Sequence, residues 1–202
     1  CNDVVELWGE FYSIDYTTEI NLPSEGLMGE IPSEIGNLIN LQTLNLYNNE
    51  LSGHIPSELG NLTNLTSLVL WANQLEGEIP PEIGNLTSLI RLDLDENQLT
   101  GSIPPEIWTL TNLNELFLSK NQLEGEIPLE IGNLTKLNYF FISENQFSGI
   151  IPTAIGNFSF LKYLRLNDNQ FSGQIPDNMC NLNIYWDTLY DFNISNNQLC
   201  PP

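Results

Sequence analysis

The chain has 202 residues, 41% of them hydrophobic, and its 26 acidic residues against 5 basic ones give a net charge of −21. Phosphate contacts need clustered Lys and Arg, so this balance argues against nucleic acid as a partner and against an anionic membrane surface. No apolar run approaches the 18 or more residues of a membrane helix, so we expect no membrane insertion. The charge favours solubility, and attraction of a basic or cation-bridged partner is the alternative interpretation.

Residues 1–16 lie outside the repeats that follow and are predicted to form a helical cap. Their apolar side chains have the spacing of one helix face: Val4, Leu7, Trp8 and Phe11. Asp3, with Glu6 three residues later, has the spacing of a capping box. An amphipathic helix at this place would cover the apolar end of the repeats.

From Thr17 onward the chain repeats with a period of 24 residues. The most regular mark of the period is a series of asparagines: Asn49, Asn73, Asn97, Asn121, Asn145 and Asn169. A period of this length predicts a solenoid, in which stacked coils bury an apolar side that no coil can bury alone. We expect about eight coils, the first of which has Glu25 where Asn would stand.

Each coil is predicted to contain one short strand and one short helical turn. Around Leu44 and Leu46, buried apolar residues alternate with variable ones, which is the period of a strand. Stacking aligns these strands into a parallel sheet. The segment Pro-Glu-Ile-Gly-Asn-Leu then crosses the back of the coil. The recurring Asn has donors and an acceptor, so we expect a stacked column of them to satisfy backbone groups where the chain turns.

The period lapses near the C-terminus, where Asn197 follows Asn169 by 28 residues and an insertion surrounds Trp186. The predicted domain organisation has three parts: an N-terminal cap at 1–16, a solenoid at 17–182, and an irregular last coil with a C-terminal cap at 183–202.

Three cysteines lie toward the two ends of the stack: Cys1, Cys180 and Cys200. This placement indicates caps secured by disulfides in an oxidising compartment. Cys180 and Cys200 lie in the last coil region and are a candidate disulfide. The alternative is that one of them, like Cys1, pairs outside this segment or stays free.

The coil at residues 65–86 matches every marked position of the repeat L-x-x-L-x-L-x-x-N-x-L-x-G-x-I-P-x-x-I-G-x-L. The chain thereby resembles leucine-rich repeat proteins of the plant-specific subtype, over about residues 17–199. The resemblance implies an α/β-type solenoid with a parallel sheet on its concave side and short 3-10 or helical turns on its convex side.

The same resemblance implies an extracellular location, either secreted or on the cell surface. Proteins with such repeats include the extracellular domains of plant receptor kinases, polygalacturonase-inhibiting proteins, and secreted or surface proteins of aquatic bacteria. Related caps tend to carry Cys where this chain has Phe11, which leaves Cys1 without the partner that the resemblance implies.

The outward positions of the predicted strands vary from coil to coil, and aromatic and basic residues gather among them. The candidate ligand-binding residues on the concave face are Tyr47, Val69, Trp71, Arg91, Phe117, Tyr139, Phe141, Tyr163 and Arg165. Exposed aromatic side chains beside Arg are typical of interface anchors. The alternative is that cross-strand aromatic pairs only stabilise the sheet.

We therefore predict a monomeric, non-enzymatic recognition module that binds a protein or peptide on the concave face. A structural or adhesive module that contacts carbohydrate through the same aromatics is the alternative, and inhibition of a cell-wall hydrolase is a further analogy at the level of fold. The only histidine is His54, and no nucleophile elbow or phosphate loop is present, so catalytic triads and zinc sites lack their parts. We expect no metal and no cofactor.

Three other sets of repeated residues have less specific interpretations. A column of carboxylates is expected on the opposite, solvated face: Glu34, Glu58, Glu82, Glu106 and Glu130. Calcium binding there is disfavoured because no loop has Ca²⁺-ligand spacing. The repeat wording produces most of six glycosylation sequons: Asn61, Asn64, Asn85, Asn133, Asn157 and Asn193. A role in ice binding would need one flat column of identical small polar residues, and this column is mixed: Ser24, Asn48, Ala72, Glu96, Lys120, Glu144, Asp168 and Asn196.

Overall fold

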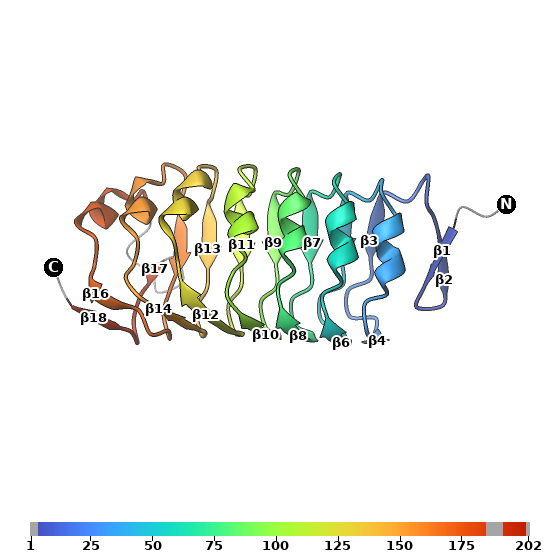
Figure 1. The fold of residues 1–202 in the computed structure, drawn as a ribbon, viewed down its shortest axis with the longest axis horizontal. Helices are drawn as coiled ribbons and strands as arrows, with labels where there is room; N and C mark the ends of the chain where they lie inside the picture. The colour runs from blue at the N-terminus through green and yellow to red at the C-terminus, as the bar shows by residue number, and fades with distance from the viewer. Residues whose placement is uncertain (1–3, 185–191, 201–202) are drawn as a thin grey trace.

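The computed structural model describes residues 4–184 and 192–200. They form an elongated stack in which the coils follow one another in chain order (Figure 1). The predicted repeat solenoid is confirmed. The predictions for Cys1, for Asp3 and for the insertion around Trp186 lie outside the described residues.

Eight short parallel strands, one from each coil, form what we call the long sheet. In chain order they are β3 (Glu19–Asn21), β5 (Thr43–Asn45), β7 (Ser67–Val69), β9 (Arg91–Asp93), β11 (Glu115–Phe117), β13 (Tyr139–Phe141), β15 (Tyr163–Arg165) and β17 (Phe192–Asn193). Neighbouring strands pair residues 24 apart, as Leu44 pairs with Leu68. The pairing of Leu164 with Phe192 absorbs the longer spacing before the last coil. One short strand per coil, aligned in a parallel sheet, is as predicted.

A second parallel sheet, which the repeat pattern did not lead us to predict, runs along another edge of the stack (Figure 1). Its strands are β4 (Met28–Gly29), β6 (Glu50–His54), β8 (Gln74–Glu78), β10 (Gln98–Gly101), β12 (Gln122–Glu126) and β14 (Gln146–Ser148). The residues after each recurring Asn supply its period of two, since Leu75 is buried between exposed Gln74 and Glu76. At the C-terminal end, β16 (Ser172–Gln174) and β18 (Gln198–Cys200) form a separate two-stranded parallel sheet.

Short 3-10 helices complete the coils on the side that faces the viewer in Figure 1. They are η1 (Ser33–Asn37), η2 (Ser57–Asn61), η3 (Pro81–Asn85), η4 (Pro105–Thr109), η5 (Leu129–Asn133), η6 (Thr153–Asn157) and η7 (Asp177–Asn181). Each follows a proline whose fixed φ leads into the turn, and each buries its central apolar residue, such as Ile83 in η3. Over residues 4–184 and 192–200, no helix has the length and apolar character that a membrane span requires.

The core is one continuous apolar cluster along the stack. Its side chains come from the inward positions of both sheets and of the 3-10 helices, and most are fully buried, as are Leu92 and Leu116 on neighbouring strands. Four buried phenylalanines replace leucine or isoleucine in this part of the core, toward the C-terminal end: Phe140, Phe147, Phe158 and Phe171. Burial of this kind contributes roughly 25 cal/mol per Å² of apolar surface and cannot be achieved by one coil alone.

The recurring asparagines form a hydrogen-bonded column that we call the Asn ladder: Asn49, Asn73, Asn97, Asn121, Asn145, Asn169 and Asn197. In the middle of it, Asn97 Oδ1 accepts a hydrogen bond from the backbone N–H of Leu75 at 3.0 Å. Its Nδ2 donates to the carbonyl oxygens of Leu70 at 3.1 Å, Leu94 at 3.2 Å and Asp95 at 3.1 Å. Two of these partners belong to the preceding coil. The amide thus joins adjacent coils and satisfies backbone groups at the turn, as predicted.

The residue before each Asn of the ladder, and before Glu25 in the first coil, has a left-handed backbone conformation. The φ values of this column lie between 53° and 59°: Ser24, Asn48, Ala72, Glu96, Lys120, Glu144, Asp168 and Asn196. Few of these side chains favour positive φ, so the fixed hydrogen bonds of the Asn ladder must hold the turn against a local cost. This is the chemically mixed column that argues against an ice-binding surface.

The N-terminal cap is an antiparallel hairpin, so the prediction of a helix was wrong. β1 (Val4–Leu7) pairs with β2 (Glu10–Ser13), and the turn between them is made by Trp8 and Gly9, whose φ values are 50° and 84°. Positive φ at both central residues is the geometry of a two-residue hairpin turn, which a helix cannot accommodate. Val5 and Leu7 are buried, whereas Phe11, expected on the apolar face, is 67% exposed.

The predicted disulfide between Cys180 and Cys200 is not formed. Both thiols are free and exposed. The coil geometry separates them, because Cys180 lies in η7 whereas Cys200 ends β18 and pairs with Gln174 of β16. The sequence places both cysteines near the last coil. It does not indicate on which side of that coil each cysteine lies.

Candidate functional site

The register of the long sheet places the predicted site residues side by side on the outward face. Tyr139 pairs with Tyr163, and Phe141 with Arg165, across β13 and β15. Phe117 on β11 pairs in turn with Phe141. The inward residue of each of these strands is buried and its two neighbours are half-buried. The side chains that differ between coils therefore form one surface.

Four rings on this surface contact one another and are called the aromatic cluster: Phe117, Tyr139, Phe141 and Tyr163. The rings of Tyr139 and Tyr163 are stacked, with centroids 4.3 Å apart and planes 4° from parallel. Phe117 and Phe141 meet edge to face at 5.2 Å. Such pairs contribute about 0.5–1.5 kcal/mol each beyond the area they bury. They stabilise the sheet and still leave ring surface half-exposed.

Toward the N-terminal end, Tyr47 stacks on Trp71, with centroids 4.9 Å apart and planes 7° from parallel. Val69, also predicted for the site, is only 7% exposed and offers little surface to a ligand. Two separate aromatic groups thus flank the middle of the sheet, at strands β5–β7 and β11–β15.

Arg91 lies between these groups, and both terminal nitrogens of its guanidinium contact neighbouring carboxylates. Its guanidinium forms ion pairs with Asp93 at 2.7 Å and with Glu115 at 3.0 Å. The same group lies over the ring of Phe117, 5.1 Å from its centroid. Two carboxylates therefore balance its charge, and its main effect is to fix the positions of Asp93 and Phe117.

Arg165 covers a second ring of the site. Its guanidinium carbon lies 4.3 Å from the centroid of Phe141, a cation–π arrangement. Lys120, which lies in the turn after β11, forms an ion pair with Glu96 at 2.7 Å, and both side chains are exposed. Surface pairs of this kind contribute little, about 0–1 kcal/mol.

An open pocket of about 300 Å³ lies where these groups meet. Its lining comes from strands β7–β15 and the turns after them: Trp71, Arg91, Asp93, Asp95, Glu96, Phe117, Phe141 and Arg165. Five of the nine predicted residues line it, namely Trp71, Arg91, Phe117, Phe141 and Arg165. Tyr47 stacks on Trp71 of the lining, Tyr139 contacts Phe117 and Phe141, and Tyr163 stacks on Tyr139 outside the lining. Val69 is buried. We call this the central pocket.

Three acidic residues of the central pocket were not predicted as site residues, namely Asp93, Asp95 and Glu96, and the pKa values of Asp93 and Asp95 are shifted. Asp93 is 5% exposed, and burial raises its pKa although the hydrogen bond and charge of Arg91 oppose the shift. Burial, and then the charge of Asp93, raise the pKa of Asp95 to about 8. The backbone N–H of Ser119 donates a hydrogen bond to Asp95 Oδ1, which partly opposes that shift. The available signal was a pair of carboxylates at successive outward positions of one coil.

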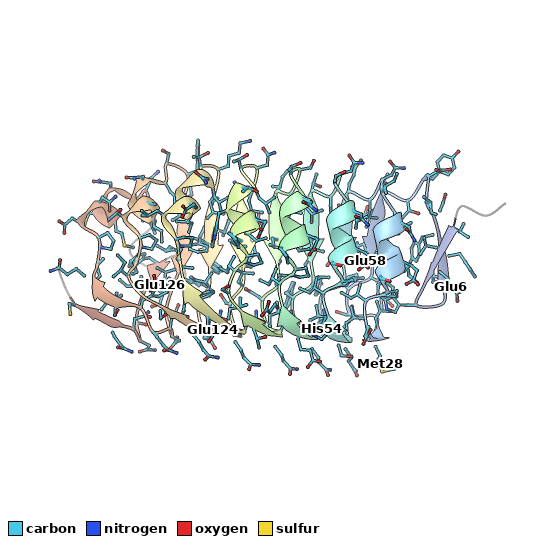
Figure 2. All side chains as sticks on the ribbon, in the orientation of Figure 1. Glu6, Met28, His54, Glu58, Glu124 and Glu126 are labelled. Atoms are coloured by element: carbon cyan, nitrogen blue, oxygen red, sulfur yellow. The ribbon has the colours of Figure 1, made fainter. Side chains whose placement is uncertain are left out.

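The other faces of the stack carry mainly acidic and polar side chains (Figure 2). The predicted glutamate column is exposed on the 3-10 helices, as Glu58 shows on η2. Glu124 and Glu126 project from β12, and the exposed His54 lies on β6, away from the long sheet. Within the described part of the chain, no group of three or more His, Cys, Asp or Glu side chains is placed to hold a metal ion.

Models of leucine-rich repeats match most of the chain. A model of a leucine-rich repeat region matches residues 21–118. A model of the single leucine-rich repeat matches residues 112–134, 136–158 and 160–182. No curated protein sequence matches the chain.

Several solved structures are similar, and they include plant receptors with a bound partner. The leucine-rich repeat ectodomain of the Arabidopsis thaliana membrane receptor kinase GASSHO1/SCHENGEN3, in complex with CASPARIAN STRIP INTEGRITY FACTOR 2, has 41% identity and a TM-score of 0.79. The match covers 86% of this chain and 20% of that one. The ectodomain of the Arabidopsis receptor kinase HAESA, in complex with the IDA peptide hormone, has 33% identity and a TM-score of 0.76, over 87% of this chain and 33% of that one.

A plant ice-binding protein is also similar, with 31% identity and a TM-score of 0.72, over 92% of this chain and 66% of that protein. The chain spans only a fifth to a third of the two receptor ectodomains. Similar structures with different binding functions share this coil, so the likeness shows the scaffold alone. By its repeats and by these structures, the chain belongs to the leucine-rich repeat family.

Proposed function

We propose that the chain is a non-enzymatic, extracellular recognition module that binds a peptide or a protein segment on the outward face of the long sheet. The observation that carries this proposal is the convergence of Trp71, Phe117 and Phe141 with charged side chains around one pocket. Rigid rings offer a large contact area at low cost in side-chain entropy, which is why interfaces rely on them.

Two further observations support a peptide ligand. The long sheet presents a continuous row of outward side chains from β5 to β15, a length that suits an extended chain better than a compact small molecule. The similar HAESA ectodomain is in complex with a peptide hormone. The net charge of −21 favours a partner with basic residues, because opposite charge accelerates encounter.

The experiment begins with peptides selected on the wild-type protein from a random library displayed on phage. Affinities of the selected peptides are then measured by calorimetry for Phe141→Ala and Tyr163→Ala. We expect a loss of at least about tenfold in each, because buried aromatic anchors contribute about 2 kcal/mol or more. Circular dichroism should show that both variants keep the fold.

Phe160→Ala is the matched control, because this ring is 62% exposed in the turn before β15 and does not line the central pocket. Its affinity should equal that of the wild type. Unchanged affinity in both Phe141→Ala and Tyr163→Ala would contradict the proposed surface. A glycan array on which saccharide binding depends on Trp71 would instead favour the adhesive alternative.

A further inference from the structure

Three carboxylates line the central pocket, those of Asp93, Asp95 and Glu96, and Glu115 lies beside it as a partner of Arg91. Three of these four carboxylates already have a cation. Asp93 and Glu115 share the guanidinium of Arg91. Glu96 pairs with the ammonium of Lys120. Asp95 differs from these three. The hydrogen bond that the structure gives to its carboxylate comes from the backbone N–H of Ser119 and reaches only Oδ1.

The surroundings of Asp95 suit a positively charged group. The rings of Trp71, Phe117 and Phe141 line the same pocket, and the face of an aromatic ring attracts a cation within about 6 Å of its centroid. The pocket of about 300 Å³ has room for the end of one long side chain. Two arginines of the site already lie over Phe117 and Phe141, which shows that these rings accept cations.

We infer that the central pocket receives a basic side chain of the ligand, a lysine or an arginine, whose cationic group pairs with Asp95 beside the rings of Trp71 and Phe117. This inference rests on the proposed function and specifies its ligand. An anionic group would fit less well, because two carboxylates neutralise Arg91 and the whole chain carries a charge of −21.

Asp95 must lose a proton to form this pair. Its pKa of about 8 means that the carboxyl is mostly protonated in the unliganded protein at neutral pH. Burial and the charges of Asp93 and Glu96 hold the proton, whereas Arg165 and the N–H of Ser119 favour its release. A ligand cation replaces the proton, so binding near pH 7 should release up to one proton per peptide.

The same linkage sets how affinity depends on pH. A lysine or arginine of the ligand stays charged up to about pH 10, so Asp95 is the group that titrates. Affinity should rise by up to about tenfold per pH unit from about pH 6 and level off above about pH 8, as one proton competes with one cation. If the ligand instead needed the protonated carboxyl of Asp95 as a hydrogen-bond donor, affinity would fall as the pH rises.

The test uses a library-selected peptide and an analogue in which the basic residue is replaced by a neutral isostere, citrulline for arginine or norleucine for lysine. Calorimetry in buffers of different ionisation enthalpy, from about pH 6 to about pH 9, measures both affinity and proton release. We expect the neutral analogue to bind at least about tenfold more weakly above pH 8, with no pH dependence and no proton release.

Asp95→Asn should bind both peptides alike and independently of pH, because it fixes the neutral state of the side chain. Glu124→Gln is the matched control, since it removes the same unit of charge from the exposed surface of β12 and should leave the linkage unchanged. Thermal melts verify that both variants fold.

The outcomes separate the inference from the proposal on which it rests. Equal binding of the two peptides to the wild type, or wild-type affinity and pH dependence in Asp95→Asn, would overturn the inference. If Phe141→Ala still abolished binding in that case, the peptide-binding surface would stand without its cationic subsite. Failure of both Asp95→Asn and Phe141→Ala to weaken binding would overturn both.

Discussion

The inward and outward sides of the same strands follow different rules. On the inward side, Leu92 and Leu116 are fully buried, and the Asn ladder repeats one set of hydrogen bonds at every coil. On the outward side, Asp93 and Phe117 occupy equivalent positions and form entirely different contacts. Because the inward side supplies the contacts that recur from coil to coil, the outward side is free to change and can even reduce stability.

Substitution of Asp95 has the largest expected effect on the free energy of unfolding. Burial stabilises the protein on the inward side, whereas burial of the Asp95 carboxyl on the outward side reduces stability at high pH. Unfolded Asp95 loses its proton near pH 3.8, the folded residue near pH 8, so the folded protein holds the extra proton between these values. Stability should therefore fall as pH rises through this window and become constant above it. Asp95→Asn should remove this penalty and stabilise the protein at pH 9 by a few kcal/mol, up to about 5.

Urea titrations of wild type and Asp95→Asn at about pH 5 and about pH 9 measure this difference. Glu124→Gln again serves as control, because Glu124 is exposed. If the stability difference between wild type and Asp95→Asn were the same at both pH values, burial of the Asp95 carboxyl would not reduce the stability of the fold.

Asn97→Ala tests the contribution of the inward side, through the Asn ladder, to stability. The substitution leaves the backbone N–H of Leu75 without its acceptor, and the carbonyls of Leu70 and Leu94 each lose one donor. We expect a loss of about 2–4 kcal/mol in the free energy of unfolding, measured in urea. Gln98→Ala, at the exposed neighbouring position, should change it by less than about 0.5 kcal/mol. Equal effects would contradict the role of the ladder.

A smaller effect on the free energy of unfolding is expected where glycines allow successive 3-10 helices to pack closely. A Cβ at Gly84 would lie 2.3 Å from Cβ of Glu106, whereas one at Gly132 would lie 3.3 Å from Cβ of Ala154. Gly84→Ala should thus cost about 1–3 kcal/mol, as overpacked sites do. Gly132→Ala, made and melted in parallel, should cost clearly less. The reverse order would mean that coils can shift apart without penalty.

The smallest predicted effect concerns the stacked pair of Tyr47 and Trp71 on the outward face. A double-mutant cycle with alanine at both positions should give a coupling of about 0.5–1.5 kcal/mol. A coupling as large as the loss in Asn97→Ala would assign the outward rings to the scaffold and weaken the case for a binding surface.

The sequence was most informative where residues repeat. The 24-residue spacing of the asparagines predicted the strands, their register and the columns of Phe117, Phe141 and Arg165, because one buried pattern admits one pairing. It failed at the N-terminal cap, where no repeat constrains the chain. There the spacing of Val4, Leu7 and Phe11 suited a helix, while the alternation of Val5 and Leu7 and the turn at Gly9 suited a hairpin.

The site could be predicted only in outline. Aromatic residues at outward positions were visible in the sequence and gather around one pocket. The importance of Asp95 depends on burial by neighbouring coils and on the nearby charge of Asp93, both of which are three-dimensional quantities. The cysteine pairing failed for a similar reason, because the spacing of Cys180 and Cys200 does not say on which side of a coil each lies.

The Asn ladder also has a direction. Each amide reaches back to the coil before it: Asn49 accepts from the N–H groups of Glu25 and Leu27 and donates to the carbonyl of Leu22. Glu25 can replace Asn in the first coil because no earlier coil needs its amide. A coil is therefore completed only by its successor, and a chain emerging from the ribosome would add order from the N-terminus onward, one turn behind synthesis.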